Sequence, residues 1–126
     1  MDVKFYRCES CGSVSIKPFD SGVSLKCCGN QMTELPANSV DAAVEKHVPV
    51  ITVEGNNVHV EVGSEPHPMI PEHYITFVCL VTEKGYQFVP LKPGQEPAVD
   101  FAVVEGDKPV KAYEFCNIHM LWVAEV

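Results

Sequence analysis

Four of the six cysteines form a spaced group close to the amino terminus. Cys8 and Cys11 are separated by two residues, and fifteen residues further on come the adjacent Cys27 and Cys28. Four thiolates in this layout can hold one metal ion. Zinc ribbons normally use two pairs spaced like Cys8 and Cys11, whereas an adjacent pair must distort the tetrahedron, so the layout favours a rubredoxin-like iron site. A structural zinc site and two disulfides are the alternative interpretations.

Length and charge narrow the class of protein. A chain of 126 residues suits one domain, or one domain beside a small metal-stabilised one. The start of the chain has neither a basic segment nor a long apolar run, so we expect no signal peptide, no membrane span and a cytoplasmic location. Thiols stay reduced there, which favours metal binding over disulfides. The net charge of −8 disfavours nucleic acid and anionic membranes as partners.

The residue pattern predicts two all-β domains. Residues 1–36 alternate short apolar stretches with glycines and cannot bury a self-sufficient core, so we expect a metal to supply much of their folding free energy. Residues 37–126 show strand patterns, such as Val58, Val60 and Val62 alternating with polar residues, and turn signals between them. About seven short strands predict an immunoglobulin-like antiparallel β-sandwich. One helical turn is expected over 39–44.

Four of the five histidines fall in predicted loops or at strand ends, where functional side chains are frequent. These are His47, His67, His73 and His119. The spacing of Cys116 and His119 lets both reach one ion from a tight turn, which makes a shared His/Cys metal site a second hypothesis. The plain alternative is that each histidine only donates or accepts hydrogen bonds. His59 lies at a polar strand position and is expected at the surface, and Cys79 is expected in the core.

Together these motifs resemble desulfoferrodoxin, the two-iron class of superoxide reductase, across essentially the whole chain. The first unit is similar to desulforedoxin through its four clustered cysteines. The second resembles the neelaredoxin-type catalytic domain. The segments that carry this resemblance are Glu45-Lys46-His47-Val48-Pro49, His67-Pro68-Met69, Glu72-His73-Tyr74-Ile75 and Cys116-Asn117-Ile118-His119. One position differs, because many relatives have glycine after the last histidine and this chain has Met120.

The resemblance implies two iron ions per chain. Cys8, Cys11, Cys27 and Cys28 would hold the first; His47, His67, His73 and His119, with Cys116 as axial thiolate, would hold the second. The implied reaction is one-electron reduction of superoxide to hydrogen peroxide. Lys46 would attract the anion and help deliver protons, and Glu45 would bind the oxidised resting iron.

The resemblance also implies re-reduction by an external donor such as rubredoxin, and a homodimer, and it leaves room for a calcium ion at an interface. Two other functional classes remain alternatives from the residues alone. One is a non-catalytic iron protein that transfers electrons with the same ligands. The other is an interaction module that combines a zinc ribbon with a β-sandwich.

Overall fold

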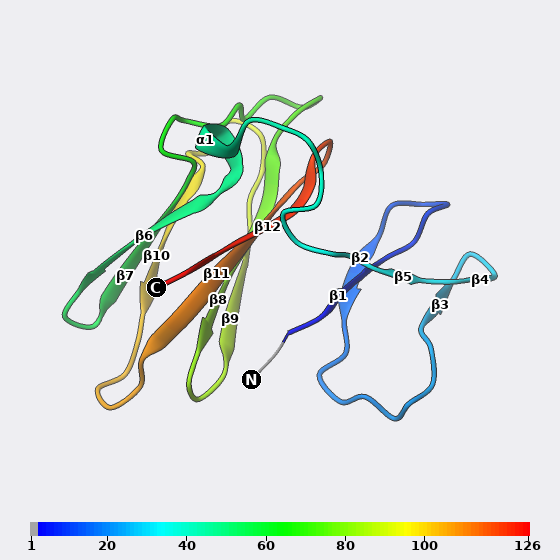
Figure 1. Cartoon of the computed structure of the whole chain (residues 1–126), viewed down its shortest axis with the longest axis horizontal. Coiled ribbons are helices and arrows are strands. Elements are labelled where there is room, and N and C mark those ends of the chain that lie inside the picture. The colour runs from blue at the N-terminus through cyan, green and yellow to red at the C-terminus, as the bar shows by residue number, and fades with distance from the viewer. Residues whose placement is uncertain (1–2) are drawn as a thin grey trace. The chain divides into compact units, whose positions relative to one another are not determined.

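The computed structural model describes residues 3–126, so the first two residues of the predicted amino-terminal domain lie outside the described part. The chain divides into two compact units, with the boundary between Pro36 and Ala37. Both are built from short strands, and the predicted all-β class is confirmed (Figure 1).

The amino-terminal unit contains two small antiparallel sheets. One has three strands in the order β2-β1-β5, formed by β2 (Val14–Ile16), β1 (Phe5–Arg7) and β5 (Thr33–Glu34). The other is the hairpin of β3 (Lys26–Cys27) and β4 (Asn30–Gln31). The buried hydrophobic residues described here are Val3, Phe5 and Cys8. So small a core provides little hydrophobic stabilisation.

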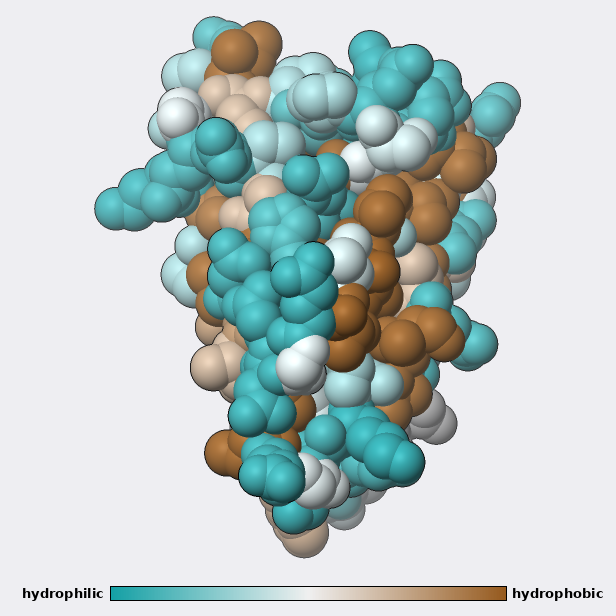
Figure 2. All heavy atoms as spheres, turned by 90° about the vertical axis from the view of Figure 1, so that its left-hand side faces the viewer, coloured by the Kyte–Doolittle hydropathy of each residue, from teal (hydrophilic) through white to brown (hydrophobic). Residues whose placement is uncertain are grey.

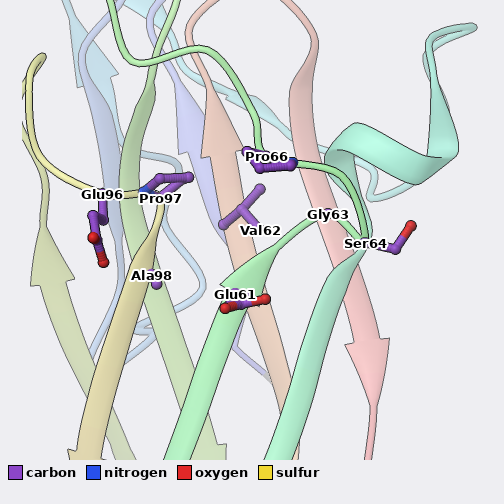
Figure 3. Close-up of a pocket in the computed structure, with 8 residues that line it drawn as sticks. All are labelled: Glu61, Val62, Gly63, Ser64, Pro66, Glu96, Pro97 and Ala98. Atoms are coloured by element: carbon purple, nitrogen blue, oxygen red, sulfur yellow. The ribbon is translucent and has the colours of Figure 1, made fainter.

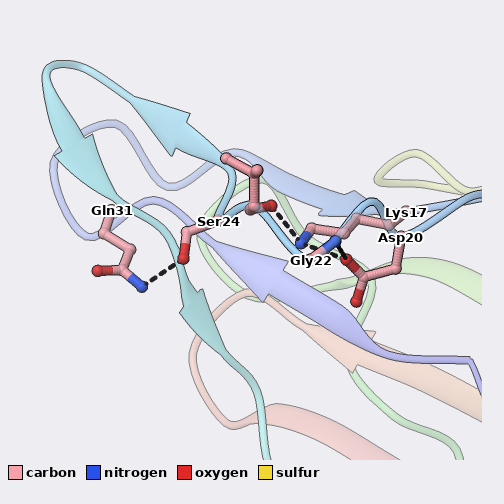
Figure 4. A network of polar contacts seen from close by, with 6 residues as sticks. Lys17, Asp20, Gly22, Ser24 and Gln31 are labelled. Atoms are coloured by element: carbon pink, nitrogen blue, oxygen red, sulfur yellow. Dashed lines mark hydrogen bonds and ion pairs between the residues drawn. The ribbon is translucent and has the colours of Figure 1, made fainter.

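Side-chain hydrogen bonds order the long β2–β3 connection instead (Figure 4). The Lys17 ammonium donates to Asp20 Oδ1 at 3.1 Å and to the carbonyl oxygen of Val23 at 2.7 Å. Gln31 Nε2 donates to Ser24 Oγ at 2.7 Å. The two Lys17 bonds brace the loop internally, and the Gln31 bond joins it to β4.

The second unit is a β-sandwich of two antiparallel sheets. The three-stranded sheet has the order β10-β7-β6, and the four-stranded sheet has the order β12-β11-β8-β9. The strands are β6 (Pro49–Glu54), β7 (Asn57–Val62), β8 (Ile75–Thr82), β9 (Tyr86–Pro90), β10 (Ala98–Ala102), β11 (Pro109–Cys116) and β12 (Met120–Glu125).

The core lies between these sheets. Val58, Val60 and Val62 of β7 pack in one hydrophobic cluster with Val78 and Leu80 of β8. The predicted alternation on β7 is therefore confirmed. His59 points to the other side of its sheet and hydrogen-bonds to Asp100 of β10, with Nδ1 and Oδ1 2.8 Å apart. Cys79 is completely buried, as expected.

The predicted helical turn over 39–44 is wrong in position. The described helix is α1 (Val44–His47), and residues 39–43 are not helical. Just before them, Asn38 exchanges two hydrogen bonds with the backbone of Val123 in β12, at 2.8 and 3.1 Å. This pairing holds the preceding chain against the sheet edge, and the helical turn starts only beyond it. As a result, the segment from Glu45 to His47 lies on the helix.

The surface is mixed in polarity. Hydrophilic residues cover much of the face shown in Figure 2, and a narrow hydrophobic strip runs between them. Apolar side chains that reach the surface of the sandwich include Val50, Val53 and Val126. Scattered exposure of this kind is ordinary for a folded domain. Within residues 3–126, no helix is both long and apolar enough to cross a bilayer.

Candidate metal centres

The four amino-terminal cysteines converge as the spacing predicted. Their sulfur atoms all lie within 4.8 Å of one another. The Sγ atoms of Cys11 and Cys27 are 3.6 Å apart, and those of Cys27 and Cys28 are 3.9 Å apart. All six cysteines of the chain are free thiols. These separations greatly exceed the length of about 2.05 Å of an S–S bond, so the disulfide alternative is wrong.

A left-handed backbone solves the geometric problem of the adjacent pair. Cys28 has a φ of +54°, and Gly29 after it has a φ of +76°. Side chains of extended neighbours point to opposite sides, but this conformation turns Cys28 back toward Cys27. The second half of the group therefore depends on a conformation that is uncommon outside glycine.

The thiols of this group cannot all ionise without a counter-charge. Hydrogen bonds from the hydroxyl and backbone of Ser13 lower the pKa of Cys11 to about 6. The thiols of Cys11, Cys8 and Cys28 raise the pKa of Cys27 to about 12. A bound cation removes this mutual repulsion because it prefers the thiolate form of every ligand. The group therefore fits a metal ion.

A second group gathers at one end of the β-sandwich. It combines His47 from α1, His67 and His73 from the β7–β8 connection, and Cys116 from the end of β11, with ligand atoms within 4.8 Å of one another. His119, from the β11–β12 turn, completes it. Its Nδ1 lies 3.0 Å from Nε2 of His47 and 3.9 Å from Sγ of Cys116.

The four imidazole rings form a closed cycle. Ring centroids are 4.8 Å apart for His47 and His67, 4.6 Å for His67 and His73, 5.2 Å for His73 and His119, and 4.7 Å for His119 and His47. Adjacent rings are inclined by 72° to 86°. Four ring edges thus surround one common space, and Cys116 adds a sulfur to it.

Backbone carbonyls orient two of these rings. Nδ1 of His47 lies 2.7 Å from the carbonyl oxygen of Ala43, and Nδ1 of His67 lies 2.7 Å from that of Pro68. Nδ1 donates in both cases, which leaves Nε2 with a lone pair. The two Nε2 atoms are 3.2 Å apart. Metal-binding histidines characteristically have their other ring nitrogen fixed in this way.

Burial favours the neutral form of three of these imidazoles. Desolvation is the main cause that lowers the pKa of His47 and His73, and it lowers that of His67 to about 4. Nε2 of His73 is buried without a hydrogen-bond partner in the described part of the chain. Neutral nitrogens that crowd one space and lack donors are what a metal ion would satisfy.

Two residues beyond the predicted ligands brace this site. The indole N–H of Trp122 donates to the carbonyl oxygen of His119 at 2.9 Å. Its ring stacks on that of His47, with the ring centroids 4.9 Å apart. Asn117 Oδ1 accepts the backbone N–H of Tyr74 at 2.9 Å, and its amide donates to the carbonyl of Glu72 at 3.0 Å. Asn117 thereby joins the Cys116 turn to the loop that carries His73. Only the position of these residues beside predicted ligands could have indicated such roles.

The chain is similar to known proteins. The model of the desulfoferrodoxin family matches residues 39–125. The desulfoferrodoxin of Syntrophotalea carbinolica is 39% identical over 123 residues, which cover 98% of this chain and 96% of that protein. This chain belongs to the desulfoferrodoxin family.

Desulfoferrodoxin relatives match both units. The desulfoferrodoxin of Clostridium acetobutylicum is 38% identical over 125 residues, 99% of this chain and 98% of its own. The superoxide reductase from Treponema pallidum, a solved structure, superposes with a TM-score of 0.85 at 40% identity and covers 99% of this chain and 100% of that one. The family resemblance predicted from the motifs is confirmed.

Glu45 and Lys46 differ from the other predicted desulfoferrodoxin site residues, because both side chains are exposed on α1. Their charges still reach the site. Lys46 contributes to lowering the pKa of His73, after desolvation and His119, and Glu45 opposes the lowering at His47. Both residues therefore lie where they can act electrostatically on the histidine group.

Proposed function

We propose that this protein is a superoxide reductase whose reaction takes place at an iron ion held by His47, His67, His73, His119 and Cys116. The observation that carries the proposal is the closed cycle of four imidazoles with one buried thiol beside it. Five donors are one more than a structural zinc site normally uses, and mixed nitrogen and sulfur suits iron. When bound, this iron would supply the electron that, with two protons, converts superoxide into hydrogen peroxide.

Residues around the site keep its ligands in place. Burial raises the pKa of Cys116, and the backbone N–H of His119, which donates to its Sγ at 3.4 Å, opposes that effect by stabilising the thiolate. Trp122 fixes His119 and covers one face of His47. Both Cys116 and Trp122 are buried, so water reaches them poorly.

Lys46 is the proposed attractor for superoxide. A protein with a net charge of −8 repels an anion at long range, so a local cation is needed at the site. Lys46 is adjacent to His47 and exposed, so its ammonium can meet the anion and pass protons through water. Glu45, on the same turn, is proposed as an additional carboxylate ligand of the oxidised metal.

A second iron and an external electron donor are also proposed. Cys8, Cys11, Cys27 and Cys28 would hold a second iron, since an adjacent cysteine pair favours iron over zinc. Rubredoxin or a similar small carrier would restore the reduced state after each turnover. A cytoplasmic homodimer is the proposed form of the protein.

Rapid mixing of the reduced, iron-loaded protein with superoxide tests the proposal. We expect near diffusion-limited oxidation of the His/Cys iron, with hydrogen peroxide as product. Lys46→Ala should slow this step about tenfold and weaken its dependence on ionic strength. A non-catalytic electron-transfer protein would instead react slowly and give no stoichiometric peroxide.

Lys108→Ala is the matched control for Lys46→Ala. Lys108 is exposed and precedes β11, whose far end carries Cys116. An eight-residue strand separates the two ends by about 23 Å. That distance exceeds the screening length of about 10 Å at 0.1 M salt, so this change should leave the rate unaltered. Equal effects of the two substitutions would remove Lys46 from the mechanism.

A further inference from the structure

The helical turn that carries Lys46 is tied to the start of the β7–β8 connection. The backbone N–H of Glu65 donates to the carbonyl oxygen of Glu45 at 2.9 Å, and Ser64 Oγ donates to the same oxygen at 3.3 Å. The N–H of Gly63 donates to the carbonyl oxygen of Val48 at 3.2 Å. We call Gly63, Ser64 and Glu65 the clasp.

These bonds hold one particular peptide group. The carbonyl of Glu45 and the N–H of Lys46 belong to the same peptide unit. The carbonyl accepts the two clasp bonds, and the N–H donates to the carbonyl oxygen of Ala43 at 3.2 Å. Because the peptide unit is planar, fixing both of its sides fixes the position of the Lys46 Cα atom, from which the side chain extends.

Gly63 is the residue that lets the two segments approach so closely. Its φ is +82°, and a Cβ there would lie 2.5 Å from the carbonyl oxygen of Glu65 and 2.6 Å from that of Glu45. It would also lie 2.7 Å from the carbonyl carbon of Lys46. All three are backbone atoms, which cannot swing aside. Any side chain at this position must displace this backbone, which disrupts the contact between the clasp and α1.

The opposite side of the clasp is not closely packed. It borders a cavity of about 340 Å³, which is lined by Gly63, Ser64, Pro66, Pro97 and Ala98, among others. Figure 3 shows Ser64 beside the helical turn and Pro66 further along the same segment, at the cavity. The hydrogen bonds to α1, rather than packing on the cavity side, therefore hold the clasp in place.

We propose that the clasp is a positioning element for Lys46, which holds its peptide group so that the ammonium stays at the mouth of the histidine group. The inference rests on the proposed superoxide reductase function. Gly63, Ser64 and Glu65 do not touch the imidazoles or the cysteine in this role; they act through the backbone of Glu45 and Lys46. Losing the clasp should therefore imitate losing the Lys46 charge.

Amide hydrogen exchange on the metal-loaded protein tests the clasp without any assay of activity. We expect Gly63→Ala to speed exchange of the Lys46 and Val48 amides about tenfold, because the turn opens more often. Gly55→Ala is the matched control. Gly55 also has a positive φ, +59°, but a Cβ added there would meet no atom within 4 Å. Equal exchange in the two variants would refute the clasp.

If Gly63→Ala does not fold, two less disruptive substitutions at Ser64 test the same hydrogen bonds. Ser64→Ala removes only the bond from Oγ to the Glu45 carbonyl, and Ser64→Thr retains a hydroxyl. We expect faster exchange over residues 44–48 in the alanine variant and near-normal exchange in the threonine variant. Unchanged exchange in Ser64→Ala would exclude the hydroxyl from the clasp.

A double-mutant cycle connects the clasp to function. If the clasp acts through Lys46, Gly63→Ala slows the reaction with superoxide, flattens its ionic-strength dependence, and adds nothing further in Lys46→Ala. If Gly63→Ala instead caused a general structural defect, its fold-reduction in rate would multiply with that of Lys46→Ala, and the ionic-strength dependence would stay intact. That result would overturn the positioning role. A wild-type protein that forms no peroxide would instead refute the proposed function, while the exchange experiment would still report on the clasp.

Discussion

Glu114 provides a prediction about stability that can be worked out in detail. This residue of β11 is completely buried, and neither carboxylate oxygen has a hydrogen-bond partner within residues 3–126. Desolvation raises its pKa well above the usual 4.5. A buried, unpaired carboxylate is costly, so the folded protein keeps the group protonated.

The consequence for pH dependence has a definite sign. Above pH 4.5 the unfolded chain releases this proton, whereas the folded protein retains it up to its raised pKa. Unfolding then releases a proton, so the free energy of unfolding falls as the pH rises. The slope for one group is about 1.4 kcal/mol per pH unit, and it ends at the folded-state pKa.

The perturbation is Glu114→Gln, which has nearly the same shape and cannot ionise. Urea unfolding of the variant and the wild type should be compared from about pH 5 to about pH 7 on protein with the same metal content. We expect the free energy of unfolding of the variant, relative to that of the wild type, to increase by about 1.4 kcal/mol for each pH unit.

Glu105→Gln serves as the control, because Glu105 is an exposed carboxyl outside the strands. The free energy of unfolding of Glu105→Gln should change with pH in the same way as that of the wild type. A difference between Glu114→Gln and the wild type that stays constant across the pH range would show that Glu114 is already ionised when folded. The reasoning from burial would then be wrong.

Three further predictions follow. Trp122→Phe keeps a ring over His47 but leaves the His119 carbonyl without its donor, so it should lower the free energy of unfolding by about 1–3 kcal/mol in urea titrations. Cys8→Ser should abolish metal binding by the cysteine group and leave the histidine group able to bind metal. If metal analysis and visible spectra show that both centres are lost, the two centres are not independent. The hydrogen bond to Asp100 raises the pKa of His59, so its stabilisation is complete below about pH 6.5 and disappears as the pH rises through the folded value. Asp100→Asn should therefore lower the free energy of unfolding more at about pH 5.5 than at about pH 8. The difference should be less than about 1 kcal/mol because the pair is exposed.

The sequence predicted the elements whose pattern is local. The alternation of Val58, Val60 and Val62 identified a strand and its buried face, and the cysteine spacing identified a group that does converge. The segment Glu54-Gly55-Asn56-Asn57, which is typical of a hairpin turn, likewise joins β6 to β7. Each of these features follows from the spacing of residue types along the chain.

Features that depend on distant contacts were not predictable in the same way. The helical turn starts at Val44 rather than earlier, after a segment that Asn38 pairs with β12. The bracing by Asn117 and the close approach at Gly63 also involve partners far along the chain or in another loop. Glu114 is an exception, since it shares strand parity with the buried Ala112 and could have been recognised as an inward carboxyl.

The two metal groups relate to folding in opposite ways. Within residues 3–36, only three hydrophobic side chains are buried, which is too small a core for independent stability, so we expect metal binding and folding there to be one event. The histidine group instead sits at the end of a sandwich whose hydrophobic interior extends well beyond it. That scaffold can assemble first and accept its ion afterwards. Removal of metal should therefore unfold the small amino-terminal unit and leave the β-sandwich folded and able to bind its ion later.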